Sequence, residues 1–229
     1  MKKIIVFNHK DYMEKEEVIS YIKNIKDRIR TDIEVVICPS DVFIPYFSGK
    51  YNFKLGSQNV GFENITGESS IKLLKSLKVF YALIAHPERI KNKLEDKSMI
   101  NKKITYCLEN NIIPIVYLKE TKEEYERKKT MDVILGQIKS YFFDVDVSSN
   151  IIICYEPSIN VPINHLLEVV LMIKQLFYRT YNVRINVLFG GGINSSNISK
   201  YNEIKEIDGF IIGKASTNVS EAIKILDSV

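Results

Sequence analysis

The sequence predicts a single (β/α)8 barrel, an α/β fold in which eight parallel strands close into a ring covered by helices. Short apolar runs rich in Val and Ile alternate with amphipathic stretches along all 229 residues. The runs show little polar–apolar alternation, as expected for strands that are buried on both faces of a parallel sheet. No Pro/Gly/Ser-rich linker divides the chain, so residues 1–229 are expected to form one domain.

The apolar runs are the predicted strands, and amphipathic stretches between them are the predicted helices. Apolar residues at helical spacing follow the first run (Val18, Ile22, Ile25, Ile29) and the sixth (Leu166, Val169, Val170, Ile173, Leu176–Phe177). Shorter helices are expected at 42–47 and 71–77, with room for about two turns each. Eight such units fit a compact barrel better than an open doubly wound sheet. The eight runs are Lys3–Phe7, Ile33–Cys38, Phe53–Ser57, Val79–Ala85, Ile112–Leu118, Ile151–Tyr155, Ile185–Phe189 and Asp208–Ile212.

Composition and charge exclude several classes of function. Apolar residues make up 45% of the chain, which is ample for a packed core, and the net charge of +4 is too small for a nucleic-acid-binding arm. No apolar run reaches the ~20 residues of a membrane helix, and the run at 4–7 is too short for a signal peptide. Cys38, Cys107 and Cys154 lie far apart within apolar runs and are expected to be reduced core residues rather than a disulfide or metal site. A cytoplasmic protein without nucleic-acid or membrane partners is predicted.

Polar residues gather where the predicted strands end, which is the end that carries the chemistry in such barrels. A lone histidine or glutamate is usually structural, but here a carboxylate, an imidazole and an ammonium are all predicted at one end of one barrel. We therefore expect an active site there. The strand-end residues are Asn8, Lys10, Gln58, Asn59, His86, Glu120, Glu156, Gly190–Gly192 and Gly213–Lys214.

The glycines after the seventh and eighth strands predict a phosphate site. Glycine lets backbone N–H groups approach an anion, although a run such as Gly190–Gly192 also suits a tight strand-to-helix turn. The pairing of this run with Gly213 and Lys214 after the next strand favours phosphate. By contrast, the charged stretch 119–129 interleaves acids and bases and is interpreted as a solvated helix face with a Glu123–Arg127 pair.

Several motifs then occur in a fixed order over nearly the whole chain. Glu95 and Gln137 fall between them. Together these residues resemble the triosephosphate isomerase family. The motifs are Asn8-His9-Lys10, Ser57-Gln58-Asn59-Val60, Thr66-Gly67-Glu68, His86-Pro87-Glu88-Arg89, Tyr155-Glu156-Pro157, Gly190-Gly191-Gly192-Ile193-Asn194 and Asp208-Gly209 through Gly213-Lys214-Ala215-Ser216.

The resemblance implies interconversion of dihydroxyacetone phosphate and D-glyceraldehyde 3-phosphate through an enediolate. Glu156 would move a proton between adjacent carbons, a neutral His86 would polarise the carbonyl, and Lys10 with Asn8 nearby would supply positive charge. Gly191, Gly192, Gly213 and Lys214 would bind the phosphate, and no metal or organic cofactor would be needed.

Two other functions stay open at this stage. The chain could isomerise another small phosphosugar, such as a tetrose phosphate, or it could be a noncatalytic phosphosugar-binding barrel. Retention of Lys10, His86 and Glu156 together argues against the binding barrel, because a binding module needs no base.

The sequence also departs from the family pattern. His9 replaces a Trp, which is expected to change packing only, and Pro87 replaces a Ser. The loop from Gln58 to Thr66 is shorter than the family loop that enters the partner subunit, yet a homodimer through Gly61–Ser69 is still predicted. The segment Pro157–Pro162 replaces the family's longer lid, so weaker closure over the substrate is expected.

Overall fold

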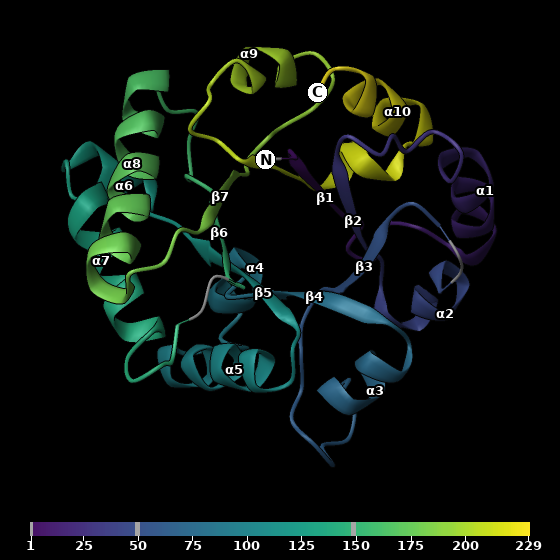
Figure 1. Ribbon diagram of the computed structural model, residues 1–229, viewed down its shortest axis with the longest axis horizontal. Helices are drawn as coiled ribbons and strands as arrows, with labels where there is room; N and C mark the ends of the chain where they lie inside the picture. Colours follow the sequence, from purple (N-terminus) through teal and green to yellow (C-terminus); the bar gives the residue numbers. More distant parts are fainter. Residues whose placement is uncertain (1, 49–50, 148–149) are drawn as a thin grey trace.

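The computed structural model describes residues 2–48, 51–147 and 150–229. All eight predicted strands are present, and they pair in chain order into a closed parallel barrel (Figure 1). The ring closes where β1 pairs in parallel with β8. The fold predicted from the apolar runs is therefore confirmed. The strands are β1 (Ile4–Asn8), β2 (Glu34–Cys38), β3 (Lys54–Ser57), β4 (Val79–Ile84), β5 (Ile113–Leu118), β6 (Ile152–Tyr155), β7 (Asn186–Phe189) and β8 (Gly209–Ile212).

Helices surround the barrel (Figure 1). The two predicted short helices are present as α2, which follows a 3₁₀ turn at Asp41–Phe43, and as α3. The predicted first stripe runs past its helix, because α1 ends at Ile25 and Ile29 is buried beyond that end. The α-helices are α1 (Lys15–Ile25), α2 (Ile44–Phe47), α3 (Ile71–Ser76), α4 (Pro87–Lys91), α5 (Lys97–Glu109), α6 (Lys122–Glu126), α7 (Thr130–Tyr141), α8 (Ile163–Tyr181), α9 (Ile198–Asn202) and α10 (Val219–Asp227).

The charged stretch 119–129 is not one helix face, so that interpretation is wrong in part. The helix α6 covers only its middle, where Arg127 Nη2 and Glu123 Oε1 form the expected pair at 2.7 Å. Lys119 and Glu120 lie between the end of β5 and Thr121, whose hydroxyl caps α6. The helix begins there because the Thr121–Glu124 capping box satisfies two backbone N–H groups, those of Thr121 and Glu124, that would otherwise lack acceptors.

Two apolar clusters fill the fold. Alternate strand residues such as Val6, Cys38 and Tyr117 point into the barrel, whereas their neighbours pack outward against the helices. The seam between β1 and β8 requires glycine, because a Cβ on Gly209 would lie 1.9 Å from the carbonyl oxygen of Ile4. All three cysteines are free and buried, as expected.

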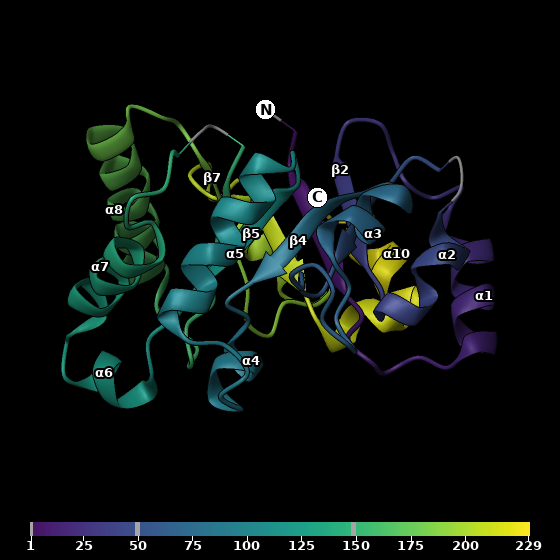
Figure 2. The same cartoon turned by 90° about the horizontal axis from the view of Figure 1, so that it is seen from below.

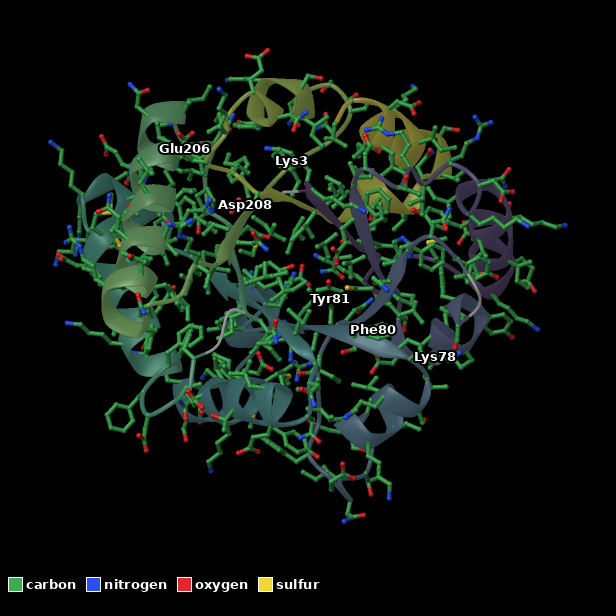
Figure 3. The ribbon with its side chains drawn as sticks, in the orientation of Figure 1. Lys3, Lys78, Phe80, Tyr81, Glu206 and Asp208 are labelled. Carbon is green, nitrogen blue, oxygen red and sulfur yellow. The ribbon has the colours of Figure 1, made fainter. Side chains whose placement is uncertain are left out.

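The two ends of the barrel differ. Figure 3 labels Lys3, Lys78 and Asp208, which precede β1, β4 and β8, at the end where the strands begin. In Figure 2, α4 and α6 lie at the other end, away from the N-terminus. That other end receives the loops that follow the strands. In the described part of the chain, no helix is long and apolar enough to cross a membrane.

Candidate active site

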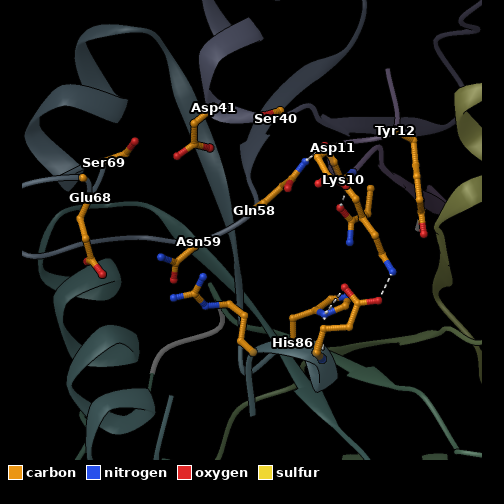
Figure 4. Close-up of a pocket in the computed structure, with 14 residues that line it drawn as sticks. Lys10, Asp11, Tyr12, Ser40, Asp41, Gln58, Asn59, Glu68, Ser69 and His86 are labelled. Atoms are coloured by element: carbon orange, nitrogen blue, oxygen red, sulfur yellow. Dashed lines mark hydrogen bonds and ion pairs between the residues drawn. The ribbon is translucent and has the colours of Figure 1, made fainter. Parts of the chain in front are cut away.

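The loop after β1 presents Asn8 and Lys10. The Lys10 backbone adopts a left-handed conformation with φ of 51°, its N–H donates to Asn8 Oδ1 at 3.3 Å, and Gln58 Nε2 donates to its carbonyl at 2.8 Å. Its ammonium points across the site to the Glu88 carboxylate, with which it forms an ion pair (Figure 4). Burial acts to lower the pKa of Lys10, but the hydrogen bond and charge of Glu88 outweigh it and raise this pKa above its usual value. Lys10 is therefore a fixed cation.

His86 caps the N-terminus of α4. Pro87 occupies the first helical position, and the Glu88 N–H donates to His86 Nδ1 at 3.2 Å. Burial lowers the pKa of His86 to about 4, an effect that the nearby Lys10 and Lys119 reinforce and the Glu88 carboxylate opposes. The imidazole is therefore neutral near pH 7. Because Nδ1 accepts a hydrogen bond, the proton resides on Nε2, which can donate to a ligand.

Glu156 is the first residue beyond β6, and its N–H donates to the Leu118 carbonyl at 3.0 Å. Burial raises the pKa of its carboxyl group above the usual value, while the Lys119 and Lys10 ammonium groups oppose that shift. Raising the pKa makes the carboxylate a stronger base than an exposed glutamate. These two cations favour the ionised form of the carboxyl group and so oppose the effect of burial.

Glu156 also packs directly against the glycine run. A Cβ on Gly190 would lie 3.0 Å from Glu156 Oε2 and 3.1 Å from Cys154 Sγ, so a side chain there would displace the carboxylate. The next residue along, Gly191, has a φ of 100° and Gly192 a φ of 69°, both in the left-handed region that favours glycine. The run thus serves both the turn and the close approach to the carboxylate.

The predicted phosphate residues after β8 lie near the loop after β1. The Lys214 and Lys10 ammonium groups both approach the Tyr12 ring, with Nζ 5.9 and 5.8 Å from its centroid. Gly213 precedes a 3₁₀ turn at Lys214–Thr217, and its carbonyl accepts from the Ser216 N–H at 2.8 Å. Two cations therefore flank one side of the barrel mouth.

A cavity of about 480 Å³ opens beside Lys10 and His86 (Figure 4). Its lining comes from the loops that follow β1, β2, β3 and β4, with Tyr12 on one side and Glu68 and Ser69 on the other. Glu156 and the glycine loops lie beyond its lining. In the described residues, no cluster of three or more His, Cys, Asp or Glu side chains could hold a metal ion.

One strand-end residue faces away from this site. The Glu120 side chain is fully buried, and its Oε1 accepts from the Tyr155 hydroxyl at 2.8 Å in the layer between barrel and helices. Its role is therefore to hold the ends of β5 and β6 together.

Glu95 and Gln137, which the resemblance in sequence includes, also support loops. Lys103 Nζ binds Glu95 Oε1 at 2.5 Å, and the Gln137 amide contacts both the N–H and the carbonyl of Lys119 at 3.0 and 2.7 Å.

The sequence pattern does not single out two residues of this region. It assigns Lys119 to a solvated helix, yet the charge of Lys119 acts on His86, Glu88 and Glu156. It includes Tyr117 only as part of an apolar run, yet the Tyr117 ring lies 4.9 Å from the His86 ring, centroid to centroid. The position of Lys119 directly after a predicted strand is the signal that could have found it, because that is where site residues of such barrels lie.

Comparisons with known proteins agree on one family. The family model described as triosephosphate isomerase matches residues 3–229. A triosephosphate isomerase of Alkaliphilus oremlandii is 31% identical over 99% of both chains, and that of Dictyoglomus turgidum is 33% identical over 94% of both. A crystal structure of triosephosphate isomerase from Bartonella henselae, 24% identical, superposes with a TM-score of 0.91 over 100% of this chain and 99% of that one, which supports the fold.

The order of the strand-end residues, the closed eight-stranded barrel and full-length relatives above 30% identity lead to one conclusion. The chain belongs to the triosephosphate isomerase family and is an isomerase.

Proposed function

We propose that the chain interconverts dihydroxyacetone phosphate and D-glyceraldehyde 3-phosphate, with Lys10, His86 and Glu156 as its catalytic residues. The observation that carries the proposal is the Glu88 N–H donated to His86 Nδ1 at 3.2 Å, in a site whose base has a raised pKa. This pairing provides a neutral donor and a strong carboxylate base together, which is what proton transfer next to a carbonyl needs.

Each group has one task in the reaction. The Glu156 carboxylate takes a proton from the hydroxyl-bearing carbon next to the carbonyl and returns it to the former carbonyl carbon, while the hydroxyl proton moves from its own oxygen to the former carbonyl oxygen, beside His86 Nε2. His86 Nε2–H donates to the oxygens on which negative charge develops, and the pKa of about 4 keeps the imidazole a neutral donor. Lys10, with Asn8 beside it, contributes positive charge to the same oxygens and to the phosphate.

The phosphate of the substrate is proposed to bind the backbone of Gly191, Gly192 and Gly213 and the residue Lys214. Two observations support this site. Gly191 and Gly192, in the loop after β7, have positive φ angles, and the Lys214 ammonium lies near the Tyr12 ring. Crystals soaked in sulfate are expected to hold the anion at these loops. An anion at the other end of the barrel, with these loops empty, would reject the assignment.

Glu156→Gln tests the function, because it preserves shape and removes the base. The kcat with triose phosphates should fall by ~10²–10⁴, the usual contribution of a positioned base. Glu126→Gln, on the exposed α6 helix, is the matched control and should retain wild-type kcat. Wild-type turnover of a tetrose phosphate alone would select the other isomerase function, and tight phosphosugar binding without turnover would select the binding barrel.

The proposed partner is a second copy of this chain, bound through the loop Gly61–Ser69, and the proposed location is the cytoplasm. The loop is closed at its base, where the Gly61 N–H donates to the Ser69 carbonyl at 2.9 Å, and its tip at 63–68 is exposed. A small, closed and projecting loop is suited to enter a neighbouring cavity.

A further inference from the structure

Tyr117 lies inside the barrel, with its ring against that of His86. It is the penultimate residue of β5, and its side chain belongs to the interior cluster together with Cys38 and Cys154. The Tyr117 and His86 rings pack edge to face, with their centroids 4.9 Å apart and their planes at 68°. The phenol therefore lies directly beside the imidazole that is proposed to hold the reacting oxygen.

The Tyr117 hydroxyl has no well-aligned hydrogen-bond partner in the described part of the chain, although it is fully buried. The Asn8 side chain and the Glu156 carboxylate both lie close enough to act on it. Burial without a partner costs free energy, so a barrel interior built from Val, Ile and Leu would be filled more favourably by an apolar ring. A hydroxyl kept here calls for an acceptor that arrives with the substrate.

We infer that the Tyr117 hydroxyl is a further catalytic residue of this enzyme, a hydrogen-bond donor to the substrate oxygens on which the enediolate charge develops. The inference rests on the proposed function. The proposed mechanism puts the reacting carbons between His86 Nε2 and Glu156. The Tyr117 ring packs against the His86 ring, and the charge of Glu156 acts on the Tyr117 hydroxyl.

The Tyr117 hydroxyl acts only as a hydrogen-bond donor. Burial raises the pKa of Tyr117 well above its ordinary value, so the group stays protonated throughout the working range of pH. It stabilises charge without exchanging its proton, and Glu156 remains the only group that this mechanism asks to move a proton between carbons.

Tyr117→Phe tests the inference because it keeps the ring against His86 and removes only the oxygen. We expect kcat to fall about tenfold with KM little changed, since hydrogen bonds to developing charge act mainly in the transition state. The thermal stability should stay at or above that of the wild type, because the lost hydroxyl had no partner. A kcat equal to that of the wild type would overturn the inference.

Tyr81→Phe is the matched control. Tyr81 is the other tyrosine of the interior cluster, and its hydroxyl binds the Glu34 carboxylate at the start of β2. Removal of that hydroxyl should reduce stability and leave kcat unchanged. If both variants lost the same factor in kcat, the effect would belong to barrel packing and the inference would fail.

Two further readouts separate the alternatives. In the pH profile of kcat/KM, the acid limb should keep its position in Tyr117→Phe. If that limb moved to higher pH with an unchanged plateau, the hydroxyl would serve the Glu156 carboxylate and the inference would be wrong.

Calorimetric titration with 2-phosphoglycolate, which carries a carboxylate and a phosphate, should show several-fold weaker binding to the variant. Unchanged binding would overturn the inference, whereas a wild type inactive on phosphosugars would instead reject the proposed function.

Discussion

Lys119 places a second cation near Glu156, the proposed base, in addition to Lys10. Of the charges that act on Glu156, Lys119 is the strongest, and its backbone is held by the Gln137 amide at the end of β5. Burial pushes the Glu156 pKa up and Lys119 pulls it back. The working basicity of Glu156 is thus a balance between two opposed effects, one from the fold and one from a single side chain.

Lys119→Met should raise the pKa of Glu156 further, because the carboxylate loses a neighbouring positive charge while its burial is unchanged. Glu156 acts as its carboxylate, so activity is lost as pH falls through this pKa. The acid limb of kcat/KM should therefore move to higher pH. Lys122→Met, on exposed α6, should leave the limb in place. If the acid limb of kcat/KM had the same position in both variants, Lys119 would not act on Glu156.

His9 shows the cost of a titratable residue in the core. Its ring packs against Tyr21 and Phe47, with centroids 4.7 and 5.9 Å away, and both of its nitrogens lack hydrogen-bond partners among the described residues. Burial lowers the pKa of His9 to about 3. These contacts agree with the expectation that His9 fills a packing position.

His9→Phe should make folding less sensitive to acid. In the unfolded chain a histidine binds a proton below about pH 6.5, whereas folded His9 stays neutral down to about pH 3. Stability therefore falls as pH drops through this window. Urea unfolding at pH 7.5 and pH 5 should show a smaller drop in the free energy of unfolding for His9→Phe than for the wild type. Equal drops would show that His9 does not contribute to acid sensitivity.

Among the elements, the connection between β6 and α8 is the one from which the sequence led us to expect weaker closure. Only four residues, Ser158 to Val161, separate two prolines, and such a stretch spans at most ~14 Å. The Ser158 hydroxyl donates to the Glu120 carbonyl, and Asn160 Oδ1 accepts from the Tyr201 hydroxyl at 3.4 Å. Because Val161 is buried as well, the connection is anchored along its length.

An anchored, short connection should retain the enediolate poorly. We expect slower triose isomerisation than in a full-lid relative and a larger fraction of turnovers ending in methylglyoxal and inorganic phosphate, because closure normally excludes water and holds the phosphate. Phosphate release and isomerisation would be measured together in both enzymes. Glu156→Gln is the control and should suppress both products, since both need the enediolate. Equal partitioning in the two enzymes would mean that another loop seals the site.

At the scale of the whole molecule, the chain carries both a projecting loop, Gly61–Ser69, and an open cavity beside Lys10. The exposed tip carries Ile65, with 49% of its surface accessible, and Thr66 next to it. The cavity of about 480 Å³ is open and polar, and it borders His86 and Glu88. A two-fold dimer in which each loop fills the other subunit's cavity would cover both features.

Sedimentation equilibrium at micromolar concentration should therefore show a dimer. Ile65→Asp should shift it toward monomer and lower kcat, since the partner loop would no longer support the site. Phe143→Asp changes an even more exposed apolar residue, 74% accessible, far along the chain from the loop, and should leave the dimer intact. A monomeric wild type would defeat the prediction.

The sequence by itself determined the eight strands and the end of the barrel that carries the candidate site residues. Runs of Val and Ile specify strands buried on both faces, and the residue after each run must lie at one rim once the strands are parallel. The order of apolar runs and polar residues along the chain is therefore enough to assign Asn8, His86, Glu156 and Gly190–Gly192 to that rim.

Only the tertiary structure decided which groups meet and in which electrostatic setting. Lys119 and Glu120 are adjacent in the chain, yet Lys119 acts on Glu156 whereas Glu120 is buried between the barrel and the helices. Tyr117 resembles a core residue in the sequence, and its position beside His86 and Asn8 exists only because β1, β4 and β5 belong to one closed ring. The reason is physical: periodicity reports which face of an element is buried, whereas distance across a barrel and the loss of solvent around a charge depend on all strands closing together.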